Sequence, residues 1–204
     1  MASVPQGTSA FDALLMKCRD LASEQLDAAL SAMFEKADET LAEQTTKTTD
    51  REEQKKLLEA RELARAKREE IEHQFHDELR SEFQRRSNKA RQTGGGFADA
   101  YLSSMELSIV ADEDLEESLK YNELAAKLVR MCEDEVNALD QRIGVLLGDA
   151  ELETDANPLG AKAICEAWKR ACHKTIESPE MRRVFLALFD ALVLEAVQIG
   201  RAHV

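Results

Sequence analysis

Glycine, proline and aromatic residues are scarce in this chain of 204 residues. It contains 8 Gly and 3 Pro, and aromatic residues make up 5% of it, whereas hydrophobic residues reach 44% and charged residues 33%. This composition is typical of long helices and not of a protein built from strands and turns. We therefore predict an all-α fold and exclude an all-β one.

The sequence also lacks long apolar runs and an export signal. No run approaches the roughly 20 apolar residues that a helix needs to cross a bilayer. Residues 1–8 have neither the basic start nor the apolar stretch of a secretion signal. We predict a cytoplasmic protein with no membrane span.

Basic residues are in the minority. The 40 Asp and Glu against 27 Lys and Arg give a formal net charge of −13, which repels nucleic acids at long range. The acidity is local, because 12 bases and 10 acids give residues 51–91 a charge of +2, whereas 4 bases and 16 acids give residues 99–157 a charge of −12. We predict no nucleic-acid partner and expect the acidic region to prefer a basic protein surface.

The four cysteines show no spacing typical of a disulfide scaffold; they are Cys18, Cys132, Cys165 and Cys172. We predict that all four are reduced. Cys172 and His173 resemble a nucleophile and its base, but adjacent residues of a helix point about 100° apart. We interpret Cys172 as a core thiol.

Apolar residues at steps of three and four predict a first helix from the cap Ser9 to about Glu43. The run of poor helix formers at residues 45–50 predicts a tight connection, in which Asp50 caps the next helix and Glu53 completes a capping box. That second helix, residues 51–91, has only a narrow apolar stripe. We predict that it packs mainly against the first helix as a hairpin.

The run Gly94 to Gly96 is the clearest break in the chain. Beyond it, a third helix is predicted from Asp112 to Leu147, where Gly148 ends it. The pairs Asn157-Pro158 and Ser178-Pro179 predict two further helix starts, which give helices at residues 158–175 and 179–198.

These elements predict a long helical hairpin followed by a small helical bundle. The predicted parts of the chain are residues 1–92 as the hairpin, 93–96 as a glycine linker, and 97–198 as an acidic helical unit. Apolar residues wrap much of the last helix, from Val184 to Val197, so we expect an exposed apolar patch and self-association.

One group of polar residues on the second predicted helix has spacings that occur in metal sites. Glu70 and His73 have the Glu-x-x-His spacing of di-iron bundles, with Glu69, His76 and Asp77 nearby, but no second such motif exists on a facing helix. We interpret them as a solvated polar face.

The acids between Asp112 and Glu117 lack the glycine and the spacing of a calcium loop. The positive end of a helix explains acids in its first turn. The three-glycine run lacks the Lys-Ser/Thr that follows in a phosphate-binding loop. Trp168 is interpreted as a residue that packs between helices. We assign no catalytic, metal-binding or cofactor-binding residue.

From about Leu107 onward, roughly half of the chain resembles the bacterial family catalogued as domain of unknown function 1631. The matching stretches are Leu107 to Val110 with the acids to Glu117, Asn157 to Leu159, Cys165 to Ala167, and Phe185 to Leu194. Gly160-Ala161 stands where the family pattern has a Ser-Pro pair. The resemblance implies a helical fold in a longer bacterial cytoplasmic protein, and it implies no reaction.

Residues 199–204 match the translation of a common short-read sequencing adapter, so we interpret them as an artefact and expect the natural chain to continue past Gln198. The leading hypothesis is a non-catalytic interaction or regulatory region that docks on a protein partner or on the remainder of its own chain. The alternative is the helical accessory part of an enzyme whose active site lies further along the natural chain.

Overall fold

The computed structural model describes residues 10–93 and 112–201, and these ranges contain six α-helices, one short 3₁₀ helix and no strand. The elements are α1 (Ala10–Lys47), α2 (Arg51–Thr93), α3 (Asp112–Met131), α4 (Glu133–Leu147), η1 (Thr154–Ala156), α5 (Ala161–Thr175) and α6 (Pro179–Arg201). The predicted all-α fold is confirmed. The cap Ser9 and the glycines 94–96 lie outside the described residues.

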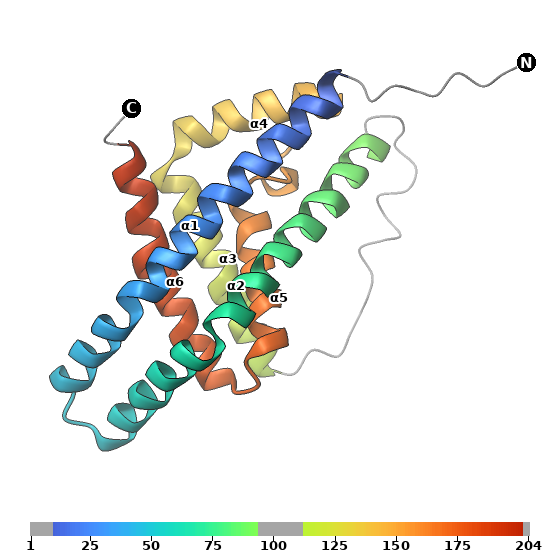
Figure 1. The fold of residues 1–204 in the computed structure, drawn as a ribbon. Coiled ribbons are helices and arrows are strands. Elements are labelled where there is room, and N and C mark those ends of the chain that lie inside the picture. Colours follow the sequence, from blue (N-terminus) through green and yellow to red (C-terminus); the bar gives the residue numbers. More distant parts are fainter. Residues whose placement is uncertain (1–9, 94–111, 202–204) are drawn as a thin grey trace, which may run out of the picture.

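The two long helices form the predicted hairpin, joined by residues 48–50 (Figure 1). The carboxylate of Asp50 accepts the backbone N–H of Glu52 at 3.0 Å, which satisfies one of the free donors at the start of α2. The capping box is not formed, because the backbone N–H of Asp50 donates to Thr48 Oγ1 at 3.3 Å and Glu53 pairs with Lys56.

The first helix is longer than its sequence pattern predicts. It continues through the threonines to Lys47, and two of their hydroxyls donate to carbonyls one turn earlier: Thr45 to Leu41 at 2.7 Å and Thr46 to Glu43 at 2.8 Å. These bonds place the threonine side chains against the helix backbone, so residues 45–47 belong to α1 and the connection is residues 48–50.

The third predicted helix is two helices in the structure. Cys132 has φ −128° and ψ 39°, which is outside the helical region, and α4 begins with the acids Glu133 to Glu135 at its positive end. The predicted end of this segment is confirmed, because Gly148 has φ +78°, a left-handed conformation that glycine adopts without strain.

The Asn157-Pro158 pair does not begin a helix, contrary to the prediction. Asn157 is fully buried, its Oδ1 accepts the N–H of Leu159 at 2.8 Å, and its Nδ2 donates to Asp140 at 2.6 Å. These bonds make a turn, and α5 starts only after Gly160. The second pair behaves as predicted, because α6 begins directly after Ser178.

The narrow apolar stripe of α2 is covered by more helices than the one partner of a two-helix hairpin. One hydrophobic core joins buried residues of α1, α2, α3, α5 and α6, and α2 packs against both α1 and α5 (Figure 1). At its centre Trp168 stacks on Phe189, with ring centroids 4.7 Å apart, and meets the edge of Phe75 at 5.9 Å. Trp168 is therefore a packing residue, as predicted.

The helices on either side of residues 93–96 thus share one core. The apolar side chains of α6 contribute to it, since Phe185, Leu188 and Phe189 are buried within the chain itself. The expectation that this helix exposes an apolar patch stays a prediction, because the side chains beyond Ala191 lie outside the described part.

Candidate interaction groove

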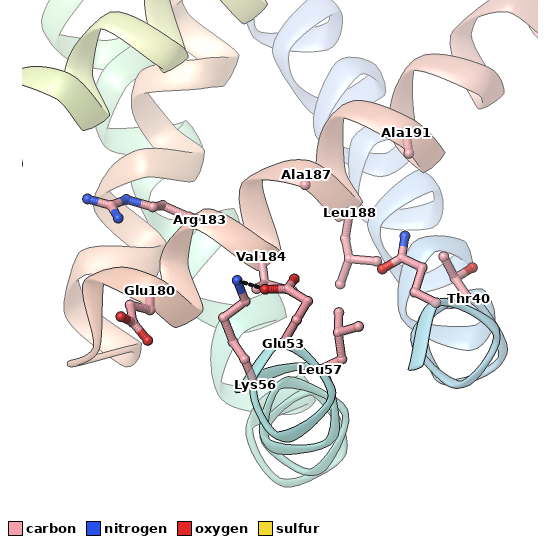
Figure 2. Close-up of a pocket in the computed structure, with 11 residues that line it drawn as sticks. Thr40, Glu53, Lys56, Leu57, Glu180, Arg183, Val184, Ala187, Leu188 and Ala191 are labelled. Carbon is pink, nitrogen blue, oxygen red and sulfur yellow. Dashed lines mark ion pairs between the residues drawn. The ribbon is translucent and has the colours of Figure 1, made fainter. Parts of the chain in front are cut away.

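A groove of about 320 Å³ lies where the closed end of the α1–α2 hairpin meets α6 (Figure 2). Three helices supply its walls. The lining residues are Thr40 and Gln44 of α1, Glu53, Lys56 and Leu57 of α2, and Glu180, Arg183, Val184, Ala187, Leu188 and Ala191 of α6.

The floor of the groove is apolar and its rim is charged. Leu57 and Leu188 point toward each other across it (Figure 2), and both are buried. Ala187 and Ala191 are exposed one helical turn apart, so the wall of α6 is low there. The ion pair between Glu53 and Lys56 lies on the α2 side. Grooves that bind the apolar face of a helix have an apolar floor of this kind.

A buried ionic cluster holds α2 on α5. The side chain of Glu82 is 0% exposed and accepts hydrogen bonds from Arg85, at 3.0 Å, and Arg86 on its own helix and from Arg170 on α5. Burial by itself raises the pKa of Glu82, but these arginines outweigh it and hold the pKa at about 2. Glu82 is therefore ionised at neutral pH and acts as a structural group.

Glu78 extends the same cluster by one turn. It accepts a hydrogen bond from Arg170 Nε at 2.9 Å and another from Lys174. Burial raises the pKa of Glu78, but the two bases lower it by more than burial raises it, so the pKa is below its usual value. Within α2 alone, Glu78 and Glu82 are a like-charged pair at i,i+4 spacing. The signal for their role was the equal i,i+4 spacing of Arg170 and Lys174 on another helix.

A second buried cluster fixes α3 to the turn between α5 and α6. Glu117 is 3% exposed. Arg182 donates from Nε to both carboxylate oxygens of Glu117 at 3.2 Å and from Nη2 to Oε2 at 3.1 Å, and His173 Nε2 lies 3.0 Å from Oε1. The same arginine donates to the carbonyls of Ile176 and Glu177. The interpretation of Glu117 as a first-turn acid is therefore wrong.

The Glu-x-x-His pair lies on the outside of α2. His73 is exposed and 3.5 Å from Asp77, and Glu70 pairs with Lys67 at 2.6 Å. His76 differs, because its Nδ1 lies 2.7 Å from Asp27 Oδ2 on α1. Within residues 10–93 and 112–201, no group of three or more His, Cys, Asp or Glu side chains is arranged to hold a metal ion.

All four cysteines are free, and the three in the second half of the chain are buried. Burial raises the pKa of Cys165 to about 12 and raises that of Cys172, which lies against Tyr121. The prediction of a core thiol at Cys172 is confirmed by its 0% exposure. His173 contacts Glu117 instead of this thiol.

The structure defines an all-helical protein with a groove between the hairpin end and α6 and with buried ion pairs between its helices. The chain belongs to the family of proteins of unknown function DUF1631: the model of the N-terminal domain of that family matches residues 10–199. The match also covers the first half of the chain, which lies outside the resemblance noted from Leu107 onward. No curated protein and no solved structure matches. No described helix could span a bilayer.

Proposed function

We propose that this domain is a non-catalytic interaction region of a larger bacterial cytoplasmic protein, which docks on a protein partner or on the remainder of its own chain. The observation that carries the proposal is the groove between the hairpin end and α6. It combines a buried apolar floor with a charged rim, and Ala187 and Ala191 leave room for the backbone of an incoming helix.

The protonation states of the buried groups support a role without catalysis. A general base works best with a pKa near the operating pH, and a reactive thiol needs a lowered pKa. Glu82 and Glu78 have lowered pKa values because arginine and lysine neutralise them, and Cys165 and Cys172 have raised ones. None of these four shifts brings a carboxylate or a thiol toward the pKa that catalysis near neutral pH requires.

The negative charge of the acidic region supports a basic partner, and the free cysteines support a cytoplasmic location. Residues 99–157 carry −12, which would accelerate association with a positively charged surface and make the rate depend on salt. The four free cysteines suit a reducing compartment, in keeping with the proposed cytoplasmic location.

Site-specific photo-crosslinking in the natural full-length protein tests the proposal. A photoreactive amino acid at Ala187, in the groove, should give a crosslink to one defined partner or to another part of the same chain. The matched control is Ala32, an exposed alanine of α1 that does not line the groove. Equal crosslinking from both positions, or none from Ala187, would refute docking in the groove.

The variant Ala187→Glu provides the second arm. A carboxylate over the apolar floor should remove the crosslinked species while the helical content and unfolding temperature stay unchanged, because Ala187 is exposed. Retention of the complex at wild-type affinity would place the interface elsewhere.

A further inference from the structure

The first half of α1 exposes a row of large apolar side chains. Phe11, Leu14 and Leu21 are 55%, 49% and 61% exposed, although α1 packs on both α2 and α4. In Figure 1 this half of the helix, drawn in dark blue, lies in front of α4. Clustered apolar side chains at a protein surface mark a site of interaction more often than single ones do.

The row follows a heptad pattern. Steps of three and four residues alternate along one side of α1, and the positions are Phe11, Leu14, Cys18, Leu21, Gln25 and Ala28. Cys18 is partly exposed, and the other five are exposed. This alternation keeps one side of a helix in contact with a second helix, as in a coiled coil. The row, hereafter the outer seam, is about 25 Å long at a rise of about 1.5 Å per residue.

We propose that the outer seam binds the outer seam of a second copy of this chain, with the two α1 helices antiparallel about a two-fold axis between Cys18 and Leu21. The side chains of the seam are bulky at its start and smaller or polar at its end. Antiparallel pairing therefore joins unlike residues of the two copies: Phe11 with Ala28, Leu14 with Gln25, and Cys18 with Leu21. Parallel pairing would place Phe11 on Phe11 and Ala28 on Ala28, which crowds one end and leaves a gap at the other.

Charge complementarity favours the same arrangement. Lys17 and Glu24 flank the outer seam one heptad apart; both are exposed, and neither has an ion-pair partner among the described residues. In the antiparallel dimer, Lys17 of one copy lies beside Glu24 of the other, and the two-fold symmetry forms this ion pair twice. In a parallel dimer the same two charges would face the uncharged Ala22 and Ala29.

The outer seam is separate from the groove of the proposed function. None of its residues lines the groove, which lies at the closed end of the hairpin. A dimer through α1 therefore leaves the groove open, and either proposal can fail without the other. The dimer also differs from self-association through the last helix, which would use side chains beyond Ala191.

The first experiment is sedimentation velocity of the full chain over a range of concentrations. We expect the wild type to form a dimer that dissociates on dilution. Leu21→Glu places a carboxylate from each copy in the seam, so it should be a monomer at concentrations where the wild type is a dimer. The matched control is Leu58→Glu, which changes a 47% exposed leucine of α2 outside the seam and should remain a dimer.

Charge reversal tests the direction of the pairing. Lys17→Glu and Glu24→Lys should each weaken the dimer about tenfold, because each change places like charges side by side at two points. The double variant should recover the wild-type dissociation constant, since opposite charges meet again. Cys18 lies next to the two-fold axis in both copies, so a short bismaleimide should link two wild-type chains, and Cys18→Ser should remove the linked product.

Four results would overturn the proposal. A wild type that is monomeric at every concentration would assign the seam to another protein or to the remainder of the natural chain. A dimer that survives Leu21→Glu would place the contact elsewhere, and equal dissociation by Leu58→Glu would mean unspecific apolar association. A double charge variant as weak as the single ones would exclude antiparallel pairing. Circular dichroism of each variant confirms that it is folded.

Discussion

The buried carboxylate of Glu82 should make the stability of this domain depend on acid. In the unfolded chain its pKa is near 4.5, whereas in the folded protein the arginines around it hold the pKa at about 2. The folded state therefore binds this proton less readily than the unfolded state. The stabilisation is present above about pH 5 and is lost as the pH falls from about 4.5 toward about 2.

The difference between the two pKa values sets the magnitude. One pKa unit corresponds to about 1.4 kcal/mol, so the ionised carboxylate contributes about 3 kcal/mol at neutral pH and about half of that at pH 3. Removing one partner from a buried ion pair costs about 3–5 kcal/mol in other proteins, which is the same range. Glu82→Gln should therefore lower the free energy of unfolding by about 3 kcal/mol at pH 7.

The assay is urea unfolding, followed by far-ultraviolet circular dichroism and by the fluorescence of the buried Trp168, at pH 7 and pH 3. The gap between wild type and Glu82→Gln should shrink by about half at the lower pH. Glu43→Gln is the control, since the ion-pair partner of this exposed acid among the described residues is Lys47 on the same helix, and it should change stability by less than about 0.5 kcal/mol. A loss below about 1 kcal/mol at pH 7, or a gap that does not depend on pH, would refute the reasoning.

Three further predictions follow from packing. Gly144→Ala should lower the unfolding temperature although alanine is the better helix former, because its Cβ would lie 2.4 Å from the carbonyl oxygen of Asp149; a higher temperature would show that this contact relaxes freely. Trp168→Ala should cost about 3–5 kcal/mol in urea unfolding, and a cost below about 2 kcal/mol would contradict its central place in the core. A thiol reagent should modify the partly exposed Cys18 in the folded chain and reach Cys172 only after unfolding. Mass spectrometry of the peptides identifies which cysteine is labelled, and early labelling of Cys172 would show that this part of the core opens.

Local features of the fold were predictable from the sequence. The apolar stripes of α1 and α2 recur at steps of three and four residues, and that period is a property of each helix alone. The cap at Asp50, the stop at Gly148 and the start after Ser178 are likewise set within a few residues of chain. The break at Cys132 was not predictable in this way, because the apolar pattern continues through it. There α3 packs on α5 and α6, whereas α4 packs on α1.

The polar interior and the groove were decided only by the tertiary structure. Glu82 and Arg170 are 88 residues apart, and Glu117 and Arg182 are 65 apart. Within its own helix, each of these residues looks like an ordinary exposed charge. Helical periodicity shows which face of a helix a residue occupies, and it does not show which other helix covers that face. The sequence by itself determined an acidic, all-helical chain with its main helix ends. The packing of α2 between α1 and α5 determined which charges are buried, since only burial against a partner of opposite charge turns an exposed acid into a structural one.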